Sequence, residues 1–359
     1  MPAIHEPTMH EMLWEWVAAQ GYRVSGEVTI GNGRIDLVAY SEADDEYVGI
    51  EVKDESNEVA QQEVASAIPG VGEGKIQSRE QHDWTDHWEQ LYRYQTSGYL
   101  DKLYLASQRP EYIFDHVQHH WKQRDAEQPD RVAELYSNSD VRQSDLGSIR
   151  IPGPHQSDAF EIVREADQLQ RTQEPSLSTT NERWVQHHIW REFDGIREGV
   201  LPNYEGAHFR RIDVAAFTGS DDPTEVYANQ EANDIIGVEA KGRNAVRNSP
   251  SRVQQQLIDY VNTGALTRVN LAVPDTDREP AVSLLRDTAS DDQAVLDNVG
   301  LYTVDQAGAV THVWQSEKLT LRYDGIHTKE DYVTDIIWGY GSEEWDREKQ
   351  YQSVFEMRS

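Results

Sequence analysis

The sequence repeats itself, and this repeat constrains the fold more than any other feature. RIDLVAY at positions 34–40 matches RIDVAAF at 211–217, and VGIEVK at 48–53 matches IGVEAK at 236–241. Apolar and polar residues that alternate in this way are typical of strands that bury one face. The chain therefore contains two copies of a unit in which one strand carries a lone aspartate and the next strand carries Glu-x-Lys.

Two further blocks extend the repeat. QLYRYQTSGYLDKLYLA at 90–106 and QLIDYVNTGALTRVNLA at 256–272 share seven of 17 residues, and both begin with a helical pattern and end with a strand pattern. TMHEMLWEW and TTNERWVQH each place a threonine three residues before a glutamate, Glu11 or Glu182, as at a helix start. All four blocks keep the same order, which indicates gene duplication with spacers of different length.

Each copy reads helix, strand, strand, strand, helix, strand, which predicts an α/β fold with a central mixed β-sheet flanked by helices. A length of 359 residues suits two domains. We expect a first domain at 1–152, a linker with one helix at 153–177, a second domain at 178–316 and a C-terminal tail with a helix at 317–359.

The chain is strongly acidic, with 64 Asp and Glu against 33 Lys and Arg and a net charge of −31. Two explanations are open: a solvated acidic coat suited to a salt-rich, halophilic cytoplasm, or an acidic protein with a basic partner. The acid excess runs the whole length of the chain, which favours salt adaptation, because the Debye length falls to about 3 Å at 1 M salt.

Several classes of protein are excluded by what the sequence lacks. It has no cysteine, so disulfides, iron–sulfur clusters and cysteine zinc sites are ruled out. The N-terminus does not resemble a signal peptide, and no apolar run is long enough to span a membrane. We therefore expect a cytoplasmic protein that does not act in a membrane.

The repeated strands bring acids and a lysine together. Side chains alternate along a strand, so Glu51 and Lys53 point to the same side, and Asp36 joins them if the two strands are neighbours. The second copy offers the same residue types at Asp213, Glu239 and Lys241. The bland interpretation of either copy alone is a solvated strand face with a surface ion pair; the repetition favours a site.

Two carboxylates at one point repel each other unless a hard cation lies between them. Mg²⁺ (or Mn²⁺) suits one or two carboxylates together with waters and substrate phosphate oxygens. A third carboxylate on the first helix of each copy, Glu11 or Glu182, would complete the metal shell. The ion makes a bound water more acidic, and the adjacent lysine can orient it. This combination predicts hydrolysis of a phosphodiester bond.

The order Asp, Glu-x-Lys on adjacent strands, then Gln-x-x-x-Tyr on a helix, resembles the PD-(D/E)XK nuclease superfamily, in its RecB-like branch. The resemblance covers most of both copies. It implies two restriction-endonuclease-like domains and a Mg²⁺-dependent DNA nuclease. In the first copy it implies that Asp36 and Glu51 bind metal with the Val52 carbonyl, that Lys53 handles the nucleophilic water, and that the DNA is contacted by Gln90 and Tyr94.

The second copy carries the same implied set: Asp213, Glu239, the Ala240 carbonyl, Lys241, Gln256 and Tyr260. Arg34 and Arg211 flank the two sites and would either contact phosphate or balance the acidic face. The proline that precedes the first aspartate in the family is isoleucine in both copies. Helicase motifs are absent, so any helicase or repair partner would be a separate protein.

Several questions stay open at this point. Both copies keep both carboxylates and the lysine, which favours two competent sites, but a silent scaffold that binds DNA or protein is the alternative. The two tyrosines are equally well read as core aromatics. The DNA partner expected is single-stranded, end or branched DNA: end-dependent or single-strand cutting is favoured slightly over paired cutting of duplex or branched DNA. RNA is a third possible substrate. The pathway expected is repair, recombination or defence.

Overall fold

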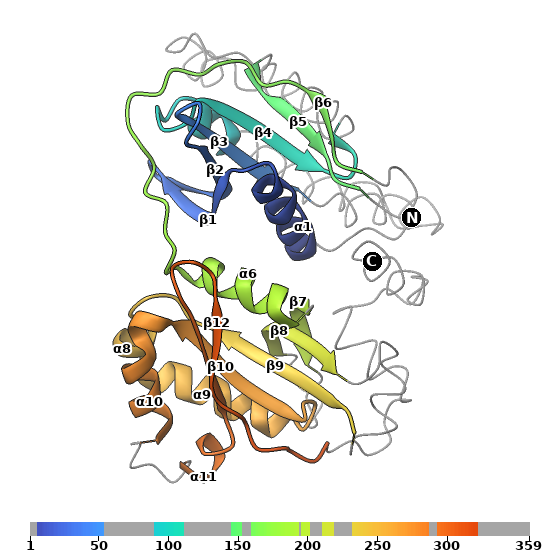
Figure 1. Cartoon of the computed structure of the whole chain (residues 1–359), viewed down its shortest axis with the longest axis vertical. Coiled ribbons are helices and arrows are strands. Elements are labelled where there is room, and N and C mark those ends of the chain that lie inside the picture. Colours follow the sequence, from blue (N-terminus) through green and yellow to red (C-terminus); the bar gives the residue numbers. More distant parts are fainter. Residues whose placement is uncertain are drawn as a thin grey trace, which may run out of the picture. The chain divides into compact units, whose positions relative to one another are not determined.

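The chain forms two compact units that meet in sequence between Leu177 and Ser178 (Figure 1). This computed structural model describes residues 6–53, 90–110, 145–152 and 159–321, with gaps at 194, 202–209, 219–231 and 287–292. The described residues include only the first five positions of the C-terminal tail, 317–321. The helix predicted for that tail lies outside them.

The first unit begins with a helix and ends with an edge strand. Residues 90–95, which start the Gln-x-x-x-Tyr block, are helical as predicted. The other elements are α1 (Glu6–Ala19), β1 (Arg23–Ile30), β2 (Gly33–Ser41), β3 (Glu46–Val52), β4 (Lys102–Ser107), β5 (Gly147–Arg150) and β6 (Glu161–Arg164).

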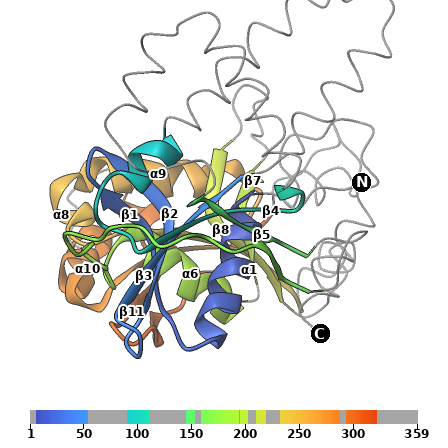
Figure 2. The ribbon, with the colours of Figure 1, turned by 90° about the horizontal axis from the view of Figure 1, so that it is seen from above.

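The second unit repeats this succession with more helix between its third and fourth strands and after the fourth. Its elements are α6 (Glu182–Phe193), β7 (Ile196–Leu201), β8 (Arg210–Thr218), β9 (Asp234–Ala240), α8 (Ala245–Asn248), α9 (Pro250–Thr263), β10 (Arg268–Pro274), η2 (Asp275–Asp277), α10 (Arg278–Arg286), α11 (Gln293–Leu296), β11 (Gly300–Val304) and β12 (Val310–Trp314). In both views α10 lies beside α8 (Figures 1 and 2).

The two sheets share one topology. Each has six strands whose spatial order follows the chain, β1 to β6 in one unit and β7 to β12 in the other. In both, the first three strands pair antiparallel, the third to fifth pair parallel, and the last strand returns antiparallel. The prediction of an α/β fold with mixed sheets flanked by helices is confirmed, and β11 and β12 end the second sheet as an antiparallel hairpin.

Helices cover both faces of the second sheet. Val185, Ile189 and Trp190 of α6 pack against apolar residues of β8 and β9 that include Val238 and Ala240. Glu239, between them, points to the other face, where it meets α9. Six of the seven residues of β3, and of β9, are buried, as is expected of strands covered on both sides. The carboxylates of Glu-x-Lys therefore lie inside the protein rather than on a solvated face.

The segment predicted as a linker is instead the last part of the first unit. Residues 161–164 form β6, and the described residues that follow contain no helix. They run as a strap whose Leu169 N–H donates to the Asp101 carbonyl at 2.7 Å. Leu319 N–H donates to the Thr267 carbonyl at 2.8 Å at the same place in the second unit. Because the strap belongs to the repeat, pairing with its own unit overrides the helical propensity of its sequence.

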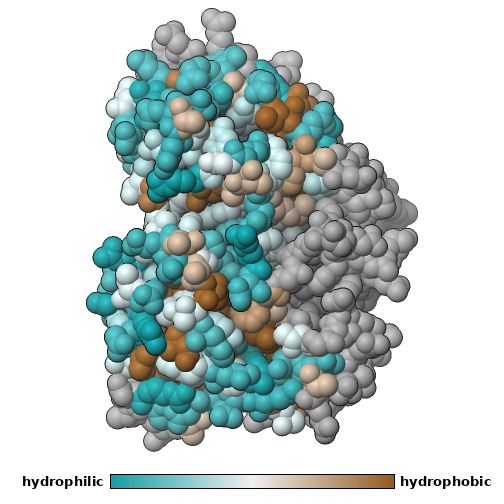
Figure 3. All heavy atoms as spheres, viewed as in Figure 1, coloured by the Kyte–Doolittle hydropathy of each residue, from teal (hydrophilic) through white to brown (hydrophobic). Residues whose placement is uncertain are grey.

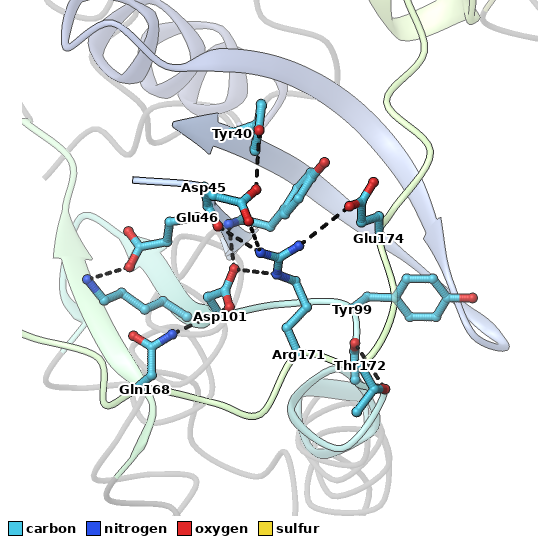
Figure 4. A network of polar contacts seen from close by, with 12 residues as sticks. Tyr40, Asp45, Glu46, Tyr99, Asp101, Gln168, Arg171, Thr172 and Glu174 are labelled. Atoms are coloured by element: carbon cyan, nitrogen blue, oxygen red, sulfur yellow. Dashed lines mark hydrogen bonds and ion pairs between the residues drawn. The ribbon is translucent and has the colours of Figure 1, made fainter. Parts of the chain in front are cut away.

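Arg171 anchors the first strap to the sheet (Figure 4). Its Nε lies 2.9 Å from Asp101 Oδ2, and its Nη2 contacts the carboxylate and the carbonyl of Asp45 at 2.9 and 2.8 Å. The guanidinium also stands over the Tyr47 ring, 5.0 Å from the ring centre. A planar cation with several fixed donors suits such a cluster of acids better than an ammonium would.

Replacing Arg171 with methionine should lower the free energy of unfolding of the first unit by about 1–3 kcal/mol, since Asp101 then keeps less than its full set of donors. Urea denaturation followed by tryptophan fluorescence measures the change. Arg23→Met is the control, because Arg23 makes an exposed ion pair with Glu42 at 3.3 Å, of a kind that contributes little. Equal effects of the two substitutions would contradict the anchoring role.

A glycine precedes the Glu-x-Lys motif by two residues in both units, in GIEVK at 49–53 and GVEAK at 237–241. The packing around the strand explains why glycine is needed there. A Cβ at Gly49 would lie 2.5 Å from Leu100 Cδ1, and a Cβ at Gly237 would lie 2.4 Å from Leu266 Cδ1. Both leucines follow the Gln-x-x-x-Tyr helix. The glycines let these residues approach the strand that carries the glutamate.

Gly49→Ala and Gly237→Ala should each destabilise the protein by about 1–3 kcal/mol, the usual cost of overpacking a well-filled core. Thermal unfolding of the two variants, with circular dichroism, checks this. The effect should be relieved when the facing leucine is also shortened, as in Gly49→Ala with Leu100→Val. Unchanged melting of both single variants would show that the neighbouring helix end yields without cost.

On the one face that Figure 3 shows, the described residues are mostly hydrophilic, with apolar areas between them. Among the helices that the structure describes, none has the length and apolar character needed to cross a bilayer.

Candidate active site

Strand pairing places the aspartate of one strand opposite the glutamate of the next in both units. Leu37 pairs with Ile50, so the next position of the same register sets Asp36 opposite Glu51. Val214 pairs with Val238, which sets Asp213 opposite Glu239 in the same way. The geometry on which the predicted site depends is therefore present twice.

In the first unit the three predicted side chains come together at the end of β3. Asp36 Oδ2 accepts a hydrogen bond from the Val52 N–H at 2.8 Å. Lys53 Nζ donates to Glu51 Oε1 at 2.7 Å. Glu51 is 1% exposed and Lys53 is half-buried. The aspartate is thus fixed by a backbone donor and the glutamate by an ammonium.

The second unit repeats these contacts and adds others. Asp213 Oδ2 accepts from the Ala240 N–H at 2.7 Å, and Lys241 Nζ forms an ion pair with Glu239 Oε1. Gln186 Nε2 also donates to Asp213 Oδ1 at 2.8 Å. Tyr260 Oη lies 2.9 Å from Glu239 Oε2.

Burial sets the electrostatics of both sites. It raises the pKa of Glu51 to about 8, with Asp36 adding to the rise and Lys53 opposing it. Burial raises the pKa of Glu239 to about 8 in the same way, with Asp213 adding and Lys241 opposing. Burial alone would lower the pKa of each lysine, but the adjacent acids outweigh it and raise the value. The lysines therefore remain ammonium ions.

The Gln-x-x-x-Tyr helices attach to the sheet through their tyrosines, which corrects the role that the resemblance implies for them. Tyr94 and Tyr260 are 1% and 2% exposed, so they have almost no surface to offer to DNA. The Tyr94 hydroxyl donates to the Arg34 carbonyl, two residues before the aspartate, and the Tyr260 hydroxyl lies in hydrogen-bond contact with the Arg211 carbonyl at the same place.

The two glutamines support these tyrosines. Gln90 Nε2 donates to Tyr94 Oη at 2.7 Å, and Gln256 Nε2 donates to Tyr260 Oη at 2.8 Å. Both glutamines are half-buried. The open alternative for the tyrosines, a place in the core, is the one that the structure adopts.

The first helices align differently from the sequence comparison. Met9, Leu13 and Trp14 of α1 are buried, and α6 buries Val185, Ile189 and Trp190 at the same spacing. This register pairs Glu6, not Glu11, with Glu182.

The outcome for the predicted helical ligands follows from that register. Glu182 Oε2 lies 3.9 Å from Lys241 Nζ, and Glu6 is close enough to contribute to the raised pKa of Lys53. Glu11 is fully buried, and it forms no metal-ligand cluster with Asp36 and Glu51. Each helical residue turns the side-chain direction by about 100°, so five residues place Glu11 about 140° around the helix from Glu6, on another face.

The same register identifies two residues beside the aspartates that the sequence analysis did not single out. His10 Nε2 lies 3.7 Å from Asp36 Oδ2, and Gln186, which occupies the matching position, holds Asp213. An imidazole is a common metal ligand, whereas an amide is a neutral donor. The signal that could have found them is their spacing from the buried tryptophans.

Two predicted roles concern groups beside the sites: phosphate contact by the arginines and metal ligation by two backbone carbonyls. Arg34 and Arg211 are exposed beside their sites, and Arg34 pairs with Glu27 at 3.1 Å. Val52 and Ala240 contact the aspartates through their N–H groups, and the ligand role of their carbonyls stays a prediction.

The residues fit a hard divalent cation of the predicted kind. Each site offers two facing carboxylates, and Glu51 Oε2 is buried without a hydrogen-bond partner among the described residues. Within the same residues, no group of three or more His, Asp or Glu side chains has metal-ligand geometry. Mg²⁺ needs no such group, because it commonly takes one or two carboxylates and completes its shell with water and phosphate.

Comparison with known proteins finds no matching family model, no matching curated protein and no matching solved structure.

Proposed function

We propose that this chain is a Mg²⁺-dependent (or Mn²⁺-dependent) DNA nuclease with two intrachain active sites. The observation that supports it most is that an aspartate, a glutamate and a lysine meet in the same geometry in both units. The pairing registers and the Asp-to-backbone bonds are the same in the two sites. A solvated ion pair on a strand face would not bury the glutamate twice.

When bound, the metal ion supplies positive charge that polarises a phosphodiester and makes a coordinated water more acidic. Asp36 and Glu51 would hold it in the first site, and Asp213 and Glu239 in the second. Lys53 and Lys241 stay protonated, so they act as positive charges that orient the nucleophile and stabilise the charge that develops on phosphate, rather than as bases.

The acidic surface bears on how DNA would be held. Attraction between basic side chains and phosphate weakens steeply with salt. Affinity in a salt-rich cytoplasm then comes chiefly from the metal ion, and exposed arginines such as Arg34 and Arg211 add less than they would in dilute salt. Single-stranded, end or branched DNA is the substrate we favour, in repair, recombination or defence.

The test is cleavage of linear, nicked and branched DNA in molar KCl, with Mg²⁺, with Mn²⁺ and with chelator, and with RNA of the same sequence as a comparison. Metal-dependent strand cleavage of DNA supports the proposal. Absence of product together with absence of metal binding by calorimetry would instead support a silent scaffold that binds DNA or a protein partner.

A further inference from the structure

The two sites differ in the hydrogen bonds that hold their glutamates, and the difference involves a tyrosine that both possess. In the second unit Tyr260 Oη lies 2.9 Å from Glu239 Oε2. In the first unit the Tyr94 hydroxyl bonds only the Arg34 carbonyl and Gln90 among the described residues, and Glu51 Oε2 is buried without a hydrogen-bond partner there. The same residue thus supports the glutamate in one site only.

The aspartates differ in the same direction. Asp213 accepts a hydrogen bond from Gln186 at 2.8 Å in addition to its backbone bond. Asp36 faces His10 at 3.7 Å, which is beyond hydrogen-bond distance. Among the described residues, each carboxylate of the second site therefore has a neutral side-chain hydrogen-bond partner that its counterpart in the first site lacks. For Glu239 this partner is the Tyr260 hydroxyl, whose one proton is shared between the glutamate and the Arg211 carbonyl.

Such donors favour metal binding. A hydrogen bond to a carboxylate stabilises its ionised form, which is the form that a cation requires, and it fixes the direction of the oxygens. Each carboxylate oxygen has two lone pairs, so a donor and a cation can share it. Groups that support metal ligands in this way typically change metal affinity by about 10- to 100-fold.

We infer that Tyr260 is a positioning residue for Glu239, and that the second site binds a divalent ion such as Mn²⁺ more tightly than the first. The inference rests on the proposed metal-dependent function. As the ion concentration rises, the second site then fills before the first.

The test isolates each site in the full-length chain and then removes one hydroxyl. Asp36→Asn disables the first site and leaves the second, and Asp213→Asn does the reverse. Tyr260→Phe is placed in the Asp36→Asn protein, and Tyr94→Phe in the Asp213→Asn protein. Manganese binding is titrated by calorimetry and by electron paramagnetic resonance of the free ion. Both phenylalanine variants lose a bond to a backbone carbonyl, so they differ chiefly in the contact with glutamate.

The Asp36→Asn protein should bind manganese more tightly than the Asp213→Asn protein. Tyr260→Phe should weaken binding to the second site about 10- to 100-fold. Tyr94→Phe should leave the Kd of the first site unchanged within about twofold. Equal Kd values for the two isolated sites, or equal effects of the two phenylalanine variants, would overturn the inference. If neither asparagine variant reduces the stoichiometry from two ions to one, the proposed metal sites themselves are wrong, and the inference fails with them.

Discussion

A chain in which Lys53 and Lys241 are both replaced by alanine should cleave DNA about 10²- to 10³-fold more slowly than the parent protein. This is the usual effect of removing one group that stabilises charge in a transition state. Each ammonium contacts the glutamate of its own site, at 2.7 Å in the first unit, and each stays charged at neutral pH. Steady-state cleavage of a labelled oligonucleotide at saturating Mg²⁺ measures the loss.

The single variants separate the two sites. Lys53→Ala and Lys241→Ala should each retain the activity of the untouched site, so the total rate falls far less than in the double variant. Lys102→Ala is the control, because Lys102 makes an ion pair with Glu46 at the opposite end of β3. Full activity of the double variant, with melting behaviour like that of the parent, would remove the lysines from the mechanism.

At each site, metal affinity should increase about tenfold for each unit by which pH rises toward 8, because one buried glutamate must lose its proton before the cation binds. Burial raises the pKa of Glu51 and Glu239 from an ordinary value of 4.5 to about 8. Below pH 8 the metal-free sites therefore hold protons that a cation must displace. Calorimetric titration with Mn²⁺ at pH 6.5, 7.5 and 8.5, in buffers of different ionisation heat, measures both the affinity and the protons released.

The same shift has a consequence for the metal-free fold. In the unfolded chain these glutamates ionise near pH 4.5, whereas in the folded chain they keep their protons to about pH 8. The unfolded state then binds fewer protons in this window, so the contribution of the two glutamates to stability is complete below pH 4.5 and is lost as pH rises through 8. Glu51→Gln with Glu239→Gln should abolish both this slope and the pH-dependent metal affinity. A metal affinity that does not vary with pH would contradict the buried, protonated state.

The strand part of the site could be predicted from the sequence because its determinants are local. Alternation along a strand fixes which side chains share a side, and Asp36, Glu51 and Lys53 need only the pairing of two adjacent strands to meet. The repeat then provides an independent second instance. The sequence did not reveal that this side of the sheet is also covered by a helix, because burial of Glu51 depends on how separate elements pack.

The helical part was aligned wrongly because a short helix start carries little information. Matching the threonine and the glutamate paired Glu11 with Glu182, whereas the buried Trp14 and Trp190 pair Glu6 with Glu182. Apolar spacing records which face is buried, and it is the better guide to a helix register. With that spacing as the guide, His10 and Gln186 would have been placed beside the aspartates.

Every strand pairing that the structure describes, and both of the straps, stay within one unit. Among the described residues neither half takes a strand from the other, so an ancestor with a single copy would already have possessed a complete sheet with its own triplet of Asp, Glu and Lys. After such a gene doubled, selection could act on the two halves at different rates, since a mutation that spoils one triplet leaves the other scaffold intact. The unequal donors around Glu51 and Glu239 are the kind of divergence that such redundancy permits.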